Sequence, residues 1–345
     1  MSHFANCKAM LQLVTVSLSL FFNALLIYFV ITKSSKKLGN YRHLMCYFSV
    51  FSMIYAIIDF LVQPYIHSHG ASFSMIMDMR DRDWNPTVAF LLVASLAGCF
   101  GVTIYAIAIN FIFRFFALQR KGQLRYFKGK YLIIWLTLPL FGGFSWVLLC
   151  WLTMHPEPEF SEYLRESIKK NYGLEADNIT YTGSYFYRDD GNGNVKWSIE
   201  NSLGALGLNV LMVIPFITIV IFGSKSYKIV QKLTEQGECD YTKRLQMQLY
   251  KALVAQTIIP MVFLFFPIGI LFAAPLFHLN IEKGSLIVTF FYALYPAVDP
   301  LPVIFFIEDY RNAFFAIFNC FANTPSKNQV ASVVSIETVD APVAP

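Results

Sequence analysis

The sequence predicts an all-α membrane protein, a bundle of seven transmembrane helices with its N-terminus outside the cell and its C-terminus inside. Hydrophobic residues make up 56% of the 345 positions and charged residues only 14%, a balance that does not describe a soluble surface. Seven long segments are nearly free of Asp, Glu, Lys and Arg, and each reaches the length of about 20 residues that a bilayer requires. The basic residues gather in alternate loops, which indicates the orientation.

The seven apolar segments follow one another along the chain. The first is too long for a removable signal peptide and lacks a small-residue cleavage site, so we expect it to remain as a helix. The second and the seventh are each interrupted by one acidic residue, Asp59 and Asp299. The predicted spans are about 9–32, 44–66, 86–113, 131–154, 201–224, 252–277 and 284–307, which together form a transmembrane domain over 9–307.

Lys and Arg next to transmembrane helices tend to stay in the cytoplasm. Loops 33–43, 114–130 and 225–251 carry 16 of these residues, against 9 in the N-terminal segment and the remaining loops together. We therefore predict that these three loops lie inside the cell and that the N-terminal segment 1–8 lies outside.

The end of the chain then lies in the cytoplasm. Residues 308–321 have the pattern of a short amphipathic helix at the membrane surface. Cys320 in this segment is well placed for S-palmitoylation, and a free cytosolic cysteine is the alternative. The composition of 322–345 predicts a disordered tail.

The long loop 155–200 is predicted to be extracellular and partly folded. The spacing of its apolar residues predicts a helix over 161–172, and a turn-rich stretch between Tyr185 and Ser198 predicts a β-hairpin that lids the bundle. Asn178 begins the only glycosylation sequon of the chain, Asn-Ile-Thr. It falls on the side that the charge pattern places outside, so we expect it to carry a glycan.

Three stretches of the sequence resemble segments of a known family: KLGNYRHLM over 37–45, LQMQLYKALVAQTIIP over 245–260 and YPAVDPLPVIFFIEDYRNA over 295–313. They resemble the nematode seven-transmembrane chemoreceptors of the Str type, a family of G-protein-coupled receptors. Arg114, within IFRFFAL, resembles the Tyr-Arg-Tyr element of that family.

The resemblance implies an olfactory-type receptor that activates a heterotrimeric G protein, in the plasma membrane of the sensory cilium of a chemosensory neuron. Departures from the broader rhodopsin-like pattern are also present. No acidic residue stands directly before Arg114, and loops 67–85 and 155–200 contain no cysteine. A disulfide from the outer loop to the third helix is therefore not expected.

The ligand cavity is predicted in the outer halves of the third, fifth, sixth and seventh helices. With 34 Phe and 19 Tyr in the chain, we expect an aromatic-lined pocket for a small, mostly uncharged ligand. Ser95 and Cys99 share one helix face there, as do Thr289 and Tyr292. We assign Asp59 to the same cavity, with a protonated, hydrogen-bonded core carboxyl as the alternative.

A conformational switch is predicted at the inner half of the seventh helix. Asp299 lies there with Tyr295 one turn earlier. Pro300 has no backbone N–H, so it should leave a carbonyl near Pro296 without its usual partner. Pro260 kinks the sixth helix, either as part of a motion or as static shape.

The inner end of the predicted bundle is strongly basic. Loop 114–130 contains six basic residues and no acidic one. These side chains are expected to meet an acidic G-protein surface or anionic lipid. The residues assigned to this contact are Arg114, Arg120, Lys121, Arg125 and Lys128.

Other classes of protein were weighed against the receptor. A ligand-gated channel or a transporter remains the alternative, because acidic residues inside a membrane also mark ion pathways. An enzyme is not expected, since the histidines near the spans lie at their edges. The six cysteines are scattered singly, which favours neither a metal site nor a disulfide scaffold, and no cofactor is expected. A net charge of +5 is not typical of a nucleic-acid-binding protein.

Overall fold

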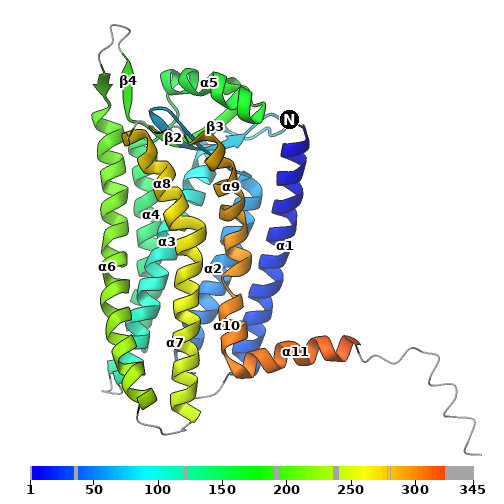
Figure 1. Ribbon diagram of the computed structural model, residues 1–345, viewed down its shortest axis with the longest axis vertical. Coiled ribbons are helices and arrows are strands. Elements are labelled where there is room, and N and C mark those ends of the chain that lie inside the picture. Colours follow the sequence, from blue (N-terminus) through cyan, green and yellow to red (C-terminus); the bar gives the residue numbers. More distant parts are fainter. Residues whose placement is uncertain are drawn as a thin grey trace, which may run out of the picture.

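The chain forms a bundle of long helices that is capped at one end by a small sheet and a further helix (Figure 1). The computed structural model describes residues 2–34, 38–119, 123–189, 195–235, 241–277, 279 and 281–322. We call the capped end the sheet end, and the opposite end, where the last helix, α11 (Glu308–Ala322), projects sideways from the bundle, the α11 end (Figure 1).

The long helices of the bundle follow one another along the chain in the predicted order. Among the described residues, six helices are long and apolar enough to cross a membrane, and a shorter apolar helix covers Ile287–Val298. The predicted seven-helix bundle is therefore confirmed. Its helices are α1 (Ser2–Thr32), α2 (Tyr41–Val62), α3 (Pro86–Gln119), α4 (Lys130–Thr153), α6 (Ile199–Glu235), α7 (Tyr241–Pro260) continued by α8 (Phe266–Ala273), and α9 (Glu282–Val298) continued by α10 (Leu301–Phe306).

The second helix ends four residues earlier than predicted. Gln63, directly after Val62, has a left-handed backbone with φ of 49°, and Pro64 follows it. The residue before a proline is kept out of the α-helical region by steric contact. The chain therefore leaves the helix at Val62 and continues as a strand, so the predicted span end at 66 is wrong.

The sheet end holds a three-stranded antiparallel sheet that the sequence analysis did not predict. Strand β2 (Ser72–Asp78) lies in the middle, with β1 (Tyr65–His69) on one side and β3 (Ile179–Tyr185) on the other. In the register of β2 and β3, Ser72 lies opposite Tyr185 and Asp78 opposite Ile179. The sheet thus joins the α2–α3 connection to the long loop that follows α4.

The long loop contributes strand β3 to this sheet and also forms a second layer over it. Its helix α5 (Pro158–Tyr172) includes the predicted helix, and its strands β4 (Tyr187–Asp189) and β5 (Val195–Trp197) form the predicted hairpin. The helix and the hairpin are confirmed, but the hairpin does not lid the bundle: it extends outward beyond the end of α6, and the sheet and α5 cover the bundle instead (Figure 1). The helix buries its apolar face on the sheet, with side chains from both layers in one cluster: Phe160, Leu164, Ile168 and Tyr172 against Tyr65, Ile76, Tyr181 and Tyr185.

Helix α3 is the central helix of the bundle and is buried along most of its length. It packs closely on α4 through glycines. A Cβ atom at Gly143 would lie 3.0 Å from the carbonyl oxygen of Gly98, and one at Gly101 would lie 3.3 Å from that of Gly142. Small residues allow helix backbones to approach each other in a membrane, and here they set the spacing of the two helices.

The remaining short elements are η2 (Gln123–Phe127), η3 (Ala176–Asn178), the π-helical turn η4 (Met261–Phe265), η5 (Ala274–Phe277) and α11 (Glu308–Ala322). Helix α11 occupies the place of the predicted amphipathic helix 308–321. The side chain of Cys320 and the predicted tail beyond Ala322 lie outside the described part of the chain, as do Arg120 and Lys121.

Candidate functional site

A cavity of about 380 Å³ lies below the sheet, between the helices of the bundle. Strands β2 and β3 form its roof through Phe73, Met75, Thr182 and Gly183. Its walls are α3, α4, α6 and α8, and α9 contributes one residue, Tyr292. The remaining lining consists of Ala97, Phe100, Trp146, Cys150, Met154, Phe186, Ser202, Ala205, Leu206, Leu208, Asn209, Met212, Phe265, Ile268, Gly269, Phe272, Ala273 and Leu276.

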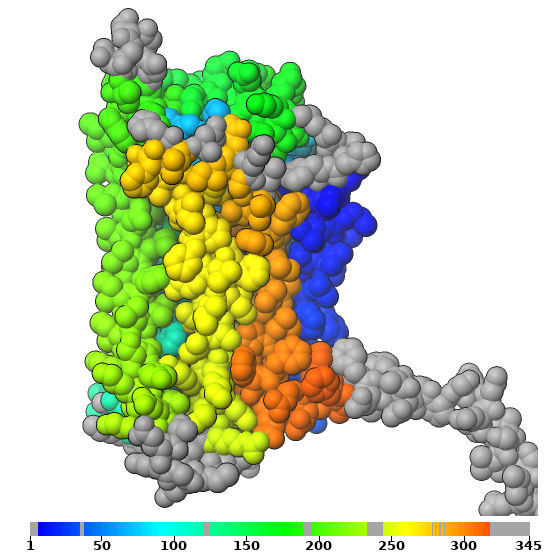
Figure 2. Space-filling view, viewed as in Figure 1, coloured from blue at the N-terminus to red at the C-terminus, as the bar shows by residue number. Residues whose placement is uncertain are grey.

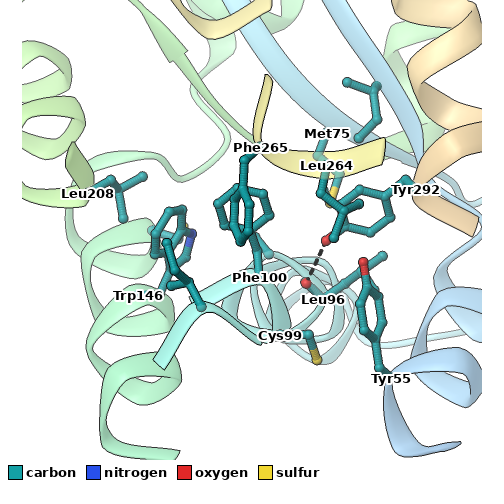
Figure 3. Close-up of a cluster of buried hydrophobic side chains, with 14 of the residues drawn as sticks. Tyr55, Met75, Leu96, Cys99, Phe100, Trp146, Leu208, Leu264, Phe265 and Tyr292 are labelled. Atoms are coloured by element: carbon teal, nitrogen blue, oxygen red, sulfur yellow. Dashed lines mark hydrogen bonds between the residues drawn. The ribbon is translucent and has the colours of Figure 1, made fainter. Parts of the chain in front are cut away.

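Aromatic rings shape both ends of the cavity. Phe100 stands between Trp146 and Phe265, with ring centroids 5.3 and 4.7 Å away (Figure 3). At the roof, Phe272 lies edge-on to Phe73 and Phe186, at 5.4 and 5.6 Å. Such edge-to-face pairs are favourable and hold the rings in fixed positions, so the cavity walls are preformed.

Three hydroxyl groups in the lining already donate their protons within the protein. The hydroxyl of Tyr292 donates to the carbonyl of Leu96 at 2.8 Å (Figure 3). Thr182 donates to the carbonyl of Met154 at 3.1 Å and Ser202 to that of Ser198 at 2.7 Å. Among the described residues, no charged side chain belongs to the lining. A site of this kind favours neutral, mainly apolar molecules.

Tyr292 is the one residue of the predicted ligand set that lines this cavity. Cys99 is buried in the same hydrophobic cluster, close behind the wall. Ser95 is half-buried on α3 and is not part of the lining. The hydroxyl of Thr289 accepts a hydrogen bond from the backbone N–H of Ile66 at 3.1 Å, so it connects α9 to strand β1.

Asp59 lies apart from the cavity, between α1 and α2. It is buried beside Lys8 and Gln12 of α1. Lys8 donates to the carbonyl of Gln63 at 2.5 Å and lies 3.2 Å from the ring centroid of Tyr65. The carboxyl is thus part of a buried polar cluster that joins the first two helices, and it does not belong to the cavity lining.

Tyrosines connect the cavity to the predicted switch. The ring of Tyr55 lies 5.6 Å from that of Tyr292 and 5.8 Å from that of Tyr295. The hydroxyl of Tyr295 donates to the Asp299 carboxylate at 3.2 Å. Gln256 of α7 donates to the backbone carbonyl of Asp299 at 3.1 Å. The side chains therefore form a continuous path from the cavity to the break between α9 and α10.

Pro300 has the predicted effect on its neighbours. The carbonyl of Pro296 accepts hydrogen bonds from Ser19 at 3.0 Å and Asn23 at 3.1 Å, both on α1. These side chains take the place of the backbone N–H that a proline lacks. The break in the seventh helix is thereby held against the first helix.

Pro260 ends α7, and the chain continues through the π-helical turn η4 before α8 begins. Phe265, the last residue of this turn, points into the cavity (Figure 3). Single π-helical turns are rare and recur at functional sites. The irregular turn that follows Pro260 thus carries a cavity residue.

Comparison with known proteins supplies the family. The family model for the serpentine type 7TM GPCR chemoreceptor Str matches residues 8–315, nearly the whole chain. The chain belongs to the Str family. It is 32% identical to the serpentine receptor class r-10 of Caenorhabditis briggsae over 296 residues, which is 84% of each chain. It is 30% identical to the Caenorhabditis elegans protein of the same name over 310 residues, 88% of each, and 29% identical to the C. elegans G-protein coupled receptor str-217 over 313 residues, also 88% of each.

Membership makes this Str chain a multi-pass membrane receptor of a chemoreceptor family. The predicted family is confirmed. The aromatic residues that build the cavity, Phe100, Trp146 and Phe265, were missed by the sequence analysis. An aromatic lining was expected, but no local sequence pattern distinguishes these three residues from the other aromatic residues of the chain.

At the α11 end of the Str receptor, Arg114 is 1% exposed. It donates to the Gln246 side chain of α7 at 2.5 Å, and its guanidinium lies 4.6 Å from the ring centroid of Tyr41. Two of its nitrogens, Nε and Nη2, are buried without a hydrogen-bond partner among the described residues. Arg125 and Lys128 are exposed at the same end, whereas Arg114 is enclosed.

At the sheet end, Asn178 is exposed at the end of η3. The four cysteines whose side chains the structure describes, Cys7, Cys46, Cys99 and Cys150, are free thiols. The cap is instead stabilised by the sheet, by the α5 cluster and by ion pairs such as that of Arg188 with Glu157 at 2.8 Å.

Proposed function

We propose that this Str receptor detects small, neutral, mostly apolar molecules in the cavity below its sheet, and that their binding activates a heterotrimeric G protein at the α11 end. The observation that carries the proposal is the cavity itself, whose walls include several aromatic rings and whose described lining residues carry no charge. Family membership supports the receptor role. The sheet end then faces the outside and the α11 end the cytoplasm, in the plasma membrane of a sensory cilium.

Two cavity residues belong to helices that are broken in the middle. Phe265 lies on the π-helical turn after Pro260, and Tyr292 lies on α9, two turns before Asp299. A molecule that binds more tightly to the arrangement in which these helices have shifted stabilises that arrangement. The size of the effect is set by the difference in its affinity for the two arrangements. Helix movement of this kind is our proposed signal across the membrane.

The α11 end supplies the element that such a shift changes. Gln246, the partner of Arg114, lies on α7, the same helix that ends at Pro260. A shift of α7 separates the two side chains. The guanidinium then leaves its buried position, because a buried cation without partners is unfavourable. Arg114 then joins Arg125 and Lys128 as a contact for the G protein or for anionic lipid.

A screen with two readouts tests this function. Cells that express the receptor are exposed to a panel of neutral volatile alcohols, ketones and esters, and to charged relatives of the same size. A G-protein readout is recorded beside membrane current. We expect G-protein responses to neutral members of the panel without a current. A current that does not depend on the G protein would favour a channel and contradict the proposal.

A further inference from the structure

The cavity must have a route by which a ligand enters it, and the inference about this route rests on the proposed function. The roof is tightly closed. A Cβ atom at Gly183 would lie 2.6 Å from the carbonyl oxygen of Phe73, so strands β2 and β3 are in close contact over the cavity. Helix α5 covers the sheet from the other side.

The exposed residues of the lining all lie on one side. They are Leu206 and Asn209 of α6, Gly269 of α8 and Leu276 of η5, and the other lining residues are buried or half-buried. Leu206 is 60% exposed and Leu276 is 44% exposed. In the described part of the chain the cavity therefore opens sideways, between α6 and α8, which lie next to each other on the face shown in Figure 2.

The surface around this opening is the surface that faces lipid. Leu203 and Val210 of α6 and Phe266 and Ile270 of α8 are each more than half exposed on either side of it. Large apolar side chains that are exposed along two spans are suited to hydrocarbon. A molecule at this opening therefore comes from the bilayer.

Asn209 gives the rim of the opening a specific polar group. It lies ten residues after Ile199, the first residue of α6, about 15 Å along the helix axis, and is exposed within the apolar part of that helix. Its amide nitrogen donates to the carbonyl of Ala205 at 2.8 Å. Its side-chain oxygen remains as an acceptor at the rim, where it can receive the proton of an alcohol.

The geometry points to a lateral access route: ligands dissolve in the bilayer and enter the cavity between α6 and α8. The ligand class follows from the route. It consists of neutral molecules that partition into membranes and are narrow enough to pass between two helices, such as medium-chain alcohols and ketones. Charged or strongly hydrated molecules of the same size reach neither the opening nor the cavity.

Gly269 allows the opening to be blocked without disturbing the fold. A Cβ atom at this position would have no atom within 4 Å. The variant Gly269→Phe therefore places a ring in the opening. Ile270→Phe is the matched control, because Ile270 is the next residue of α8, is 59% exposed and does not line the cavity.

The test uses 1-bromooctane as the probe and Trp146 as the reporter, with the purified receptor in lipid nanodiscs. Bromine quenches tryptophan fluorescence on contact, and Trp146 lines the cavity. The Trp146 signal is the difference between each protein and the same protein with Trp146→Phe. We expect Gly269→Phe to slow both the onset and the reversal of quenching by about tenfold or more, with the final extent unchanged. Ile270→Phe should match the unmodified receptor.

Two results would overturn the inference, and they have different meanings. Equal quenching rates in Gly269→Phe and in the unmodified receptor would show that the route is elsewhere, while the cavity remains the binding site. No quenching of Trp146 at all would show that the cavity does not admit apolar molecules, and the proposed function would fail with the route.

Discussion

Asp299 lies where side chains from three helices meet. Its carboxylate accepts from Tyr295 of its own helix, and the hydroxyl of Ser52 on α2 lies 3.5 Å away. Its backbone carbonyl accepts from Gln256 on α7. A residue placed in this way is sensitive to any relative movement of the three helices, because each of these bonds depends on their spacing.

Replacement of Asp299 by Asn tests its part in the switch. The amide keeps the size and an acceptor for Tyr295 but removes the charge, so the receptor should reach the surface and respond with the same ligand affinity. Basal or maximal G-protein output should change, because a shift of about 1 kcal/mol alters a two-state ratio roughly fivefold. Surface amount, affinity and output are measured together, with Asp309→Asn in α11 as the control. Unchanged output at equal surface amount would rule out the switch role.

At the scale of elements, the α3–α4 contact depends on glycine. In Gly143→Ala the new methyl group collides with Val102 and meets the Gly98 carbonyl. We expect a loss of stability of about 1–3 kcal/mol, the usual cost of overpacking, seen as a lower midpoint of thermal unfolding in detergent. Gly269→Ala introduces the same methyl group into open space and should have little effect. Equal midpoints in the two variants would contradict the close packing of these helices.

The cap should lose stability as the pH falls. His67 is fully buried, and its ring nitrogens pair with the hydroxyls of Tyr172 at 3.1 Å and Ser167 at 3.0 Å. Burial, together with nearby His69, lowers the pKa of His67 to about 4, although Glu282 opposes this. An unfolded histidine has a pKa of about 6.5, so between these values the unfolded cap binds more protons than the folded cap. The loss therefore begins below about pH 6.5 and is complete near pH 4.

His67→Gln isolates this effect, because glutamine can form hydrogen bonds but does not titrate. Titration of His67 should make the free energy of unfolding about 2 kcal/mol smaller at pH 5 than at pH 7. The unfolding midpoint of the unmodified receptor should consequently fall further between pH 7 and pH 5 than that of His67→Gln. Parallel falls in the two proteins would show that His67 is not the titrating group.

Hydropathy and proline chemistry predict the helices well, because both act locally. The lengths of the spans follow from apolar runs, and the free carbonyl at Pro296 follows from Pro300 alone. Its partners Ser19 and Asn23 could not be foreseen, since they come from the other end of the chain. The three-stranded sheet was missed for the same reason: β2 is short, and its partner β3 lies about 100 residues away in the sequence.

At the scale of the whole molecule, the orientation in the membrane rests on the basic residues of the loops. The sheet end should therefore be extracellular, with Asn178 exposed on it. Enzymatic removal of glycans should increase the mobility of the receptor on a gel, and Asn178→Gln should abolish that shift. A tag on the N-terminus should bind antibody on intact cells, whereas a tag after Pro345 should require permeabilisation. Reversed access of the two tags would overturn the orientation.

The candidate site was predictable in character but not in detail. An aromatic, uncharged pocket was expected from composition, and Tyr292 was named as part of it. Asp59 was assigned to the cavity because an acidic residue inside the membrane is costly and is usually functional, but its neighbours include Lys8 and Gln12. Which of 34 Phe residues face one cavity depends on how five helices and a sheet are rotated against one another, and sequence spacing does not determine that.

Filling the cavity tests most directly whether it is the binding site that drives signalling. Ala205 is a buried lining residue of α6, whereas Leu203 on the same helix is 59% exposed and lies outside the lining. At equal surface amount, Ala205→Phe should reduce sensitivity to every active neutral odorant of the panel by about tenfold or more, and Leu203→Phe should leave it unchanged. Full sensitivity in Ala205→Phe would contradict the assignment of this cavity as the ligand site.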